Sequence, residues 1–160
     1  MRRFGLITLI ALLLTACEGV NNNSVPAYPV QVTIDTRIGA FVNFVPTALN
    51  TYVTVDGMGY HYDDNTYPLG AMDATGYGGV VVYINMLGSY DAYDMACPNC
   101  ALHSRRQPCV IDGIFAECPH CGEQYDLGSG TAVPTKGLSQ SALRRLNVIN
   151  TDGKLVITQR

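Results

Sequence analysis

Apolar and polar residues alternate with a period of two along much of the chain, in short segments bounded by Gly, Pro, Asn and Asp. This period is typical of half-buried β-strands, and a run of β-branched residues is typical of a strand buried on both faces. A helical spacing occurs only at 139–146, over barely two turns. Strand candidates lie at 30–35, 41–45, 51–55, 78–84 and 90–94, and a closing hairpin at 146–149 and 155–157. Short strands separated by turn signals predict an all-β sandwich or small barrel.

The first residues follow a different pattern. Two arginines precede an apolar run from Phe4 to Leu14, which is too short for a membrane-spanning helix of roughly 20 residues and is typical of a secretion signal. The run ends in Leu-Thr-Ala-Cys17, which resembles the lipobox of bacterial lipoproteins, where a peptidase cuts before a lipidated cysteine. The resemblance implies a signal peptide at 1–16 and an acylated Cys17. An ordinary secretion signal with a chance cysteine is the alternative.

The segment 17–27 is polar and rich in Asn, so we expect a flexible tether there and a folded domain at 28–160. These features predict an extracytoplasmic protein of the cell envelope, held on a membrane by lipid. Charged residues make up 14% of the chain and the net charge is −3, without a basic cluster, which argues against a nucleic-acid partner. Neither a catalytic triad, a paired-carboxylate motif nor a phosphate loop is recognisable, so we do not expect an enzyme.

The cysteines carry the clearest chemical signal. Five of the six lie after position 96, and four form two Cys-x-x-Cys pairs, Cys97 with Cys100 and Cys118 with Cys121. Each pair has Pro in second place, and Gly122 follows the second pair, so each pair can form a tight turn that points two sulfurs at one centre. Four thiolates suit Zn²⁺ or an iron–sulfur centre. Disulfides or a redox-active dithiol are alternatives in an exported protein, but such pairs usually open a helix, and here we expect β loops.

The sequence from Cys118 to Leu127 resembles the second ligand box of Rieske iron–sulfur domains, Cys-Pro-x-His-Gly-Ser-x-Phe/Tyr-Asp. The resemblance extends over roughly 78–158, with 128–137 matching the loop that covers the cluster. It implies a Rieske-like antiparallel β-sandwich with a small metal-binding subdomain at one tip, built on loops at 95–127. It also implies a [2Fe-2S] cluster, electron transfer and a redox protein as partner.

The ligand set departs from the family. Cys121 stands where the second-box His is expected, and Asn99 stands at the first-box His position with Cys100 one residue on. The ligands expected here are therefore four thiolates: Cys97, Cys100, Cys118 and Cys121. On a [2Fe-2S] core they add two negative charges relative to the Rieske set and lower the reduction potential. The Cys-x-x-Cys turns themselves resemble those of rubredoxins and zinc ribbons, so a single Zn or Fe ion is the alternative.

Other residues near the boxes have weaker signals. The serine that donates to a Rieske cluster is replaced by Glu123, while Tyr125 is kept. We expect His120 to point away from the metal, and His103 to be at most a substitute ligand. Cys109 is expected to be a buried free thiol. We expect Arg105 and Arg106 to form a solvated loop tip that could steer an acidic partner. We expect Asp63-Asp64-Asn65 to be a solvated turn.

Overall fold

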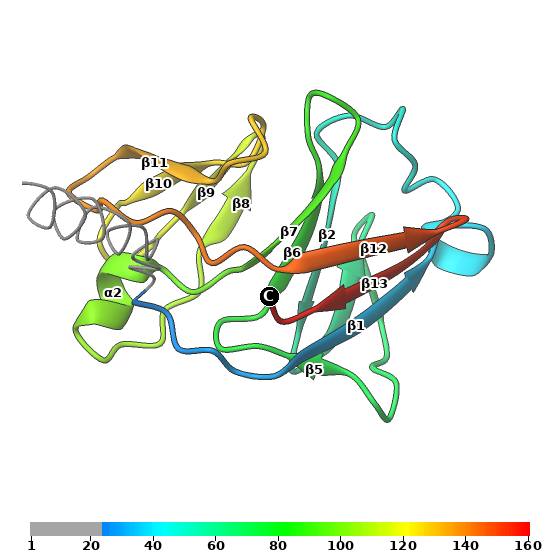
Figure 1. Ribbon diagram of the computed structural model, residues 1–160, viewed down its shortest axis with the longest axis horizontal. Coiled ribbons are helices and arrows are strands. Elements are labelled where there is room, and N and C mark those ends of the chain that lie inside the picture. Colours follow the sequence, from blue (N-terminus) through cyan, green and yellow to red (C-terminus); the bar gives the residue numbers. More distant parts are fainter. Residues whose placement is uncertain (1–23) are drawn as a thin grey trace, which may run out of the picture.

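The computed structural model of the protein describes residues 24–160 (Figure 1). Within that range the chain is almost entirely β. The predicted signal peptide at 1–16 and Cys17 lie outside the described residues. The strands are β1 (Val30–Asp35), β2 (Tyr52–Asp56), β3 (Gly59–Tyr62), β4 (Asn65–Tyr67), β5 (Ala74–Thr75), β6 (Val80–Ile84), β7 (Tyr90–Asp94), β8 (Val110–Asp112), β9 (Phe115–Glu117), β10 (Gln124–Asp126), β11 (Val133–Lys136), β12 (Asn147–Thr151) and β13 (Lys154–Thr158). The helical elements are the 3-10 turn η1 (Gly39–Phe41) and the α-helix α2 (Pro98–Leu102).

The strands form three antiparallel sheets. One has the order β4-β3-β2-β6-β7, a second the order β12-β13-β1-β5, and a smaller one the order β11-β10-β9-β8. Figure 1 shows the small sheet beside α2 at one end of the molecule, with the other two sheets forming the rest. The predicted fold class, an all-β antiparallel sandwich with a small subdomain at one tip, is confirmed.

Strand β6 separates two hydrophobic cores. All five of its residues are buried, as expected for its β-branched run. Because side chains alternate along a strand, Val80, Val82 and Ile84 pack in the core between the two larger sheets, whereas Val81 and Tyr83 pack in a second core beneath the small sheet. The second core also contains Cys97, Cys100, Cys109 and Cys118. One strand thus fixes the cysteine-bearing subdomain to the main sandwich.

The predicted strand at 41–45 is wrong. The segment forms η1 and then turns, and the ring of Phe44 is fully buried. The rings of Phe41 and Phe44 pack against tyrosines of the neighbouring strands, with ring centroids 5.5–5.8 Å apart. The alternation of Phe and Val in the sequence therefore reflects two aromatic anchors on a turn rather than a strand.

The helical spacing noted at 139–146 does not correspond to a helix, because this segment is extended. Leu143 N donates to Ala132 O, Arg144 O accepts from Asp94 N, and Leu146 N donates to Ala92 O, so the segment runs beside β7. Leu143 is buried in the second core and Leu146 in the first. The three-residue spacing of these leucines arises because the extended chain passes from one core to the other.

The remaining β predictions agree with the structure. The strands at 30–35, 51–55, 78–84 and 90–94 correspond to β1, β2, β6 and β7, and the closing hairpin corresponds to β12 and β13. Asp63 and Asp64 form the exposed turn between β3 and β4, with positive φ values of 50° and 59°. Among residues 24–160, no helix is both long and apolar enough to cross a membrane.

The chain is already in contact with the domain at its first described residues. Val25 is buried, and its carbonyl oxygen accepts a hydrogen bond from Nη1 of Arg144 at 2.8 Å. The Ser24 hydroxyl donates to the carbonyl oxygen of Pro98 in α2 at 2.5 Å. We expected residues 24–27 to be the end of a flexible tether. The first two of them, Ser24 and Val25, instead contact the folded domain.

Candidate metal centre

The first cysteine pair lies at the start of α2. Cys97 is the N-cap residue, and Pro98 occupies the first turn, where its missing N–H is not needed for an intrahelical bond. Ala101 N donates to Cys97 O at 3.0 Å, which closes a turn that contains Cys100. The expectation of a β loop is therefore wrong for this pair. Because the pair opens a helix, its secondary structure is compatible with a redox-active dithiol as well as with a metal site.

The second pair lies in the hairpin between β9 and β10. Cys118 N donates to Glu123 O at 2.8 Å, and Gly122 N donates to Cys118 O at 2.9 Å, so the six-residue connection folds back on itself. Gly122 has φ +71°, and nothing lies within 4 Å of the position where a Cβ would be. Glycine is therefore favoured at 122 by backbone conformation and not by lack of space.

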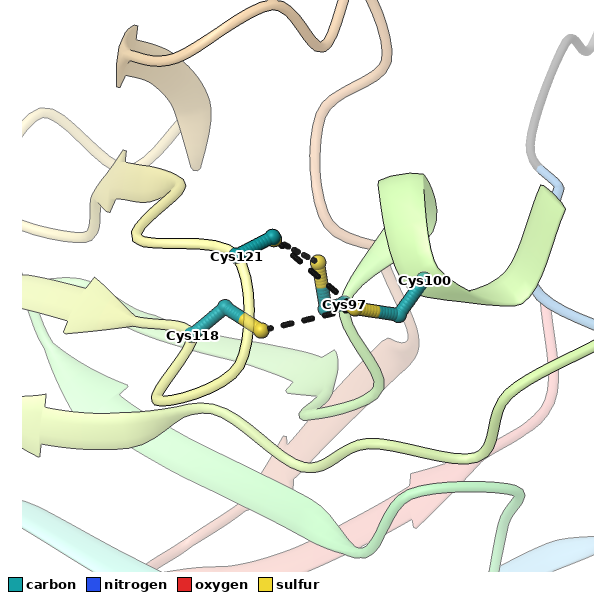
Figure 2. A group of neighbouring side chains, drawn as sticks. All are labelled: Cys97, Cys100, Cys118 and Cys121. Carbon is teal, nitrogen blue, oxygen red and sulfur yellow. Dashed lines mark hydrogen bonds between the residues drawn. The ribbon is translucent and has the colours of Figure 1, made fainter. Parts of the chain in front are cut away.

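The structure brings the four predicted cysteines together. The Sγ atom of Cys121 lies 3.6 Å from that of Cys97 and 3.7 Å from that of Cys100, and the Sγ atoms of Cys100 and Cys118 are 3.6 Å apart (Figure 2). All four sulfurs lie within 4.8 Å of one another. These short distances connect one pair with the other, and all five described cysteines are free. The arrangement is that of four ligands around one point rather than two separate dithiols.

The sulfur spacing fits a tetrahedral metal ion. Metal–sulfur bonds of about 2.3 Å place the sulfurs of a tetrahedral site about 3.8 Å apart. A [2Fe-2S] cluster would instead take two sulfurs at each iron and hold the two pairs apart along the line joining the irons. However the four cysteines are divided into two pairs, at least one of the three short distances joins sulfurs of different pairs. The four donors therefore fit one ion more closely than a two-iron cluster.

Burial and mutual contact make these thiols depend on a cation. Burial, and after it the neighbouring thiols, raises the pKa of Cys100, and burial raises the pKa of Cys118. Cys97 differs, because a hydrogen bond with Cys109 is the largest influence and lowers its pKa to about 4 despite its burial. Four thiolates in this space would repel one another, and a metal ion bound between them would supply the compensating positive charge.

Two donors lie against the Cys97 sulfur. The Tyr125 hydroxyl is 3.5 Å from Sγ of Cys97 and is fully buried. Cys109 is the second donor, because its hydrogen bond to Cys97 and its burial raise its pKa and keep it a thiol. Cys109 reaches this position through an isolated antiparallel bridge between Ala96 and Pro108, which puts 97 and 109 on the same side. The expectation of a buried free thiol is correct, but its contact with a ligand was missed.

Glu123 has a different role from the serine that it replaces. Its carboxylate is buried and accepts hydrogen bonds from Leu138 N at 2.6 Å and from Ser139 N at 3.0 and 3.1 Å. A Cβ at Gly137 would lie 2.3–2.5 Å from the same carboxyl group. Glu123 therefore ties the segment after β11, next to the predicted covering loop at 128–137, to the second cysteine pair.

The histidines are not part of the four-cysteine group. His103 and His120 are both exposed, and neither belongs to the described cluster of candidate metal ligands. Arg105 and Arg106 are exposed in the segment between α2 and β8, and the guanidinium of Arg106 lies over the ring of Tyr77 at 5.8 Å. Among the described cysteines Cys121 is the exposed residue, so the four-cysteine group reaches the surface at this residue.

No protein-family model and no curated protein matches the sequence. Three solved structures are similar to the chain. The complex of reduced oxygenase and oxidized ferredoxin in carbazole 1,9a-dioxygenase is 13% identical with a TM-score of 0.47, covering 81% of this chain and 93% of that one. A ferredoxin of Sphingomonas yanoikuyae B1 is 18% identical with a TM-score of 0.41, covering 72% and 94%. The ferredoxin of carbazole 1,9a-dioxygenase from Nocardioides aromaticivorans IC177 is 14% identical with a TM-score of 0.44, covering 82% and 98%. These likenesses agree with the all-β fold class.

Proposed function

We propose that the chain is an electron carrier of the cell envelope, anchored through lipid on Cys17, and not an enzyme in its own right. Its redox centre is one iron ion on four thiolates: Cys97, Cys100, Cys118 and Cys121. The observation that carries the proposal is the set of three sulfur–sulfur distances of 3.6–3.7 Å between the two pairs. Iron bound in this way supplies one-electron chemistry, and the chain's own residues adjust and expose it.

Two features of the site favour a redox role. Cys121 is an exposed residue while the other three proposed ligands are buried, which gives a partner protein a short route to the centre. At another proposed ligand, the Tyr125 hydroxyl lies 3.5 Å from the Cys97 sulfur, and the neighbouring Cys109 lowers the pKa of Cys97. Reduction adds a negative charge to the centre, and donors on a ligand sulfur stabilise the more negative state.

A structural zinc ion is the second candidate. The core beneath the small sheet contains three of the four proposed ligands, Cys97, Cys100 and Cys118. A metal ion bound to them would join the two cysteine pairs within this core and contribute directly to the stability of the subdomain. This role needs no redox activity and no partner.

The two-iron cluster expected from the Rieske resemblance is the third outcome. It would require the two cysteine pairs to move apart relative to the observed spacing.

The lipid anchor rests on the Leu-Thr-Ala-Cys17 motif and on the apolar run before it.

Metal analysis of the chain purified without oxygen distinguishes the single iron ion, the structural zinc ion and the two-iron cluster. We expect one iron per chain, no acid-labile sulfide and a red colour that bleaches on one-electron reduction. A colourless protein with one zinc would overturn the redox proposal in favour of the structural one. Two irons with two sulfides would show that the sulfur spacing had been misinterpreted.

The anchor needs its own experiment. Mass spectrometry of the N-terminal peptide should show acyl chains on Cys17, and Cys17→Ser should move the protein from the membrane to the aqueous fraction with unchanged metal content. An unmodified Cys17 would overturn the anchor without affecting the metal centre.

A further inference from the structure

The chain enters the folded domain at the end that carries the cysteines. The Ser24 hydroxyl donates to the carbonyl oxygen of Pro98, the residue between the first ligand and the rest of α2. Val25 is buried, and its carbonyl oxygen is bound by Arg144. These contacts fix the entry point of the chain against the first cysteine pair, and Figure 1 shows the start of the described chain beside α2.

Chain length limits how far this end can lie from a lipid on Cys17. Ser24 follows Cys17 by seven residues. Since an extended chain spans at most about 3.3–3.6 Å per residue, these residues reach about 25 Å. An acylated Cys17 would therefore keep α2 close to the lipid headgroups. The length of this segment does not limit the distance between the membrane and the far end of the sandwich in the same way.

Two exposed leucines flank the four sulfurs at this end. Leu102, 67% exposed, follows Cys100 by two residues. Leu138, 92% exposed, is held by its backbone N–H to Glu123, which follows Cys121 by two residues. Because Cys100 and Cys121 are 3.7 Å apart at their sulfurs, both leucines belong to one end of the molecule.

The same segments are basic. Arg105, Arg106 and Lys136 are all exposed, and neither 95–111 nor 127–151 contains an Asp or Glu. The acidic residues of the same subdomain, Asp112, Glu117, Glu123 and Asp126, lie in the sequence between those two segments. Exposed apolar side chains beside cations are the combination that binds an anionic membrane surface.

We propose that the cysteine end of the domain faces the membrane, with Leu102 and Leu138 in contact with the lipid headgroup region. This inference rests on the lipid anchor of the proposed function and is independent of the metal's identity. The Cys121 sulfur then lies near the lipid surface, within reach of a redox partner that is itself held in the membrane. A soluble partner would instead need this end to face the aqueous phase.

Tryptophan fluorescence can test the orientation, because the chain contains no Trp. Leu138→Trp is introduced into the full-length acylated protein, reconstituted in vesicles of phosphatidylethanolamine and phosphatidylglycerol. The matched control is Ile38→Trp, 68% exposed, between β1 and η1. Ile38 is the N-cap of η1, and Figure 1 shows this cyan helical turn at the end of the molecule away from α2.

We expect lipids brominated near the headgroup to quench Leu138→Trp at least twofold more than Ile38→Trp, with a blue-shifted emission for Leu138→Trp alone. Leu102→Trp should behave like Leu138→Trp and serves as a second reporter if one variant fails to fold. Equal quenching at the two ends, or stronger quenching of Ile38→Trp, would overturn the orientation.

The acylation state separates failure of this inference from failure of the proposed anchor. If the mass of the N-terminal peptide shows an acylated Cys17 and the two ends are quenched equally, the orientation alone is wrong. If Cys17 carries no lipid, the anchor is wrong and the orientation is overturned with it.

Discussion

The hydroxyl of Tyr125 lies 3.5 Å from the Sγ atom of Cys97, in a position where neither group reaches solvent. Tyr125 is on β10 and Cys97 precedes α2, so this contact also joins the two halves of the site. A donor on a ligand sulfur stabilises the reduced, more negative state of an iron centre. The contact therefore connects the packing of the small sheet with the potential of the site.

Removing this hydroxyl should lower the potential. A hydrogen bond of about 1 kcal/mol corresponds to about 40 mV for one electron, so Tyr125→Phe should shift the potential by about that amount to more negative values. Voltammetry of the iron form measures the shift. Tyr83→Phe is the matched control, because its buried ring lies in the same core and its hydroxyl donates to Gly113 O at 3.2 Å. Equal shifts in both variants would show that the Tyr125 contact has no special effect.

Glu123 should contribute to stability without contributing to metal binding. Glu123→Ala leaves the N–H groups of Leu138 and Ser139 without their acceptor. We expect the free energy of unfolding to fall by about 1.5–3 kcal/mol, which is the contribution of a hydrogen bond to a charged group. Denaturant titration measures this change, and metal analysis of the folded variant should give the wild-type content.

Glu117→Ala provides the matched control for that experiment. Glu117 is half-buried and accepts one long hydrogen bond, from Nε2 of Gln124 at 3.5 Å. Its loss should cost less than about 1 kcal/mol. If Glu123→Ala lowered the free energy of unfolding no more than Glu117→Ala, the hydrogen bonds of the Glu123 carboxylate to Leu138 and Ser139 would not stabilise the fold.

Local patterns predicted much of this molecule. The strand β6 and the hairpin β12–β13 could be predicted because β-branched runs and an Asp-Gly turn act within a few residues. That the four cysteines lie together was also predictable, since the two-residue spacing puts each pair in one turn. What sequence could not show was that α2 forms between Cys97 and His103, because a single helical turn has no periodicity to detect.

The wrong or missed features depend on contacts between distant segments. Cys109 meets Cys97 only because Ala96 pairs with Pro108. Leu143 and Leu146 have a helical spacing but belong to two different cores. Val25 follows an Asn-rich segment and is nevertheless buried. In each case the deciding contact joins residues that are far apart in the sequence, so a local sequence pattern could not reveal it.

Cys121 and Cys109 should respond oppositely to the same substitution. Cys121→Ala removes one of four ligands and should abolish metal retention, although its side chain is the most exposed of the set. Cys109→Ala removes only a neighbour of a ligand and should keep one metal per chain. Metal analysis after gel filtration measures both. A full metal content in Cys121→Ala, or its loss in Cys109→Ala, would show that the ligand set is misassigned.

Removing the metal should loosen one core and spare the other. Four of the described cysteines lie in the core beneath the small sheet, whereas the core between the larger sheets contains none of them. With a strong chelator at neutral pH, we expect amide exchange in β8–β11 to rise at least tenfold, which corresponds to about 1.4 kcal/mol of local stability. Strands β1 and β13 should keep their protection. An equal rise in those strands would mean that β6 couples the two cores into one cooperative unit, and that the metal stabilises the whole domain rather than its tip.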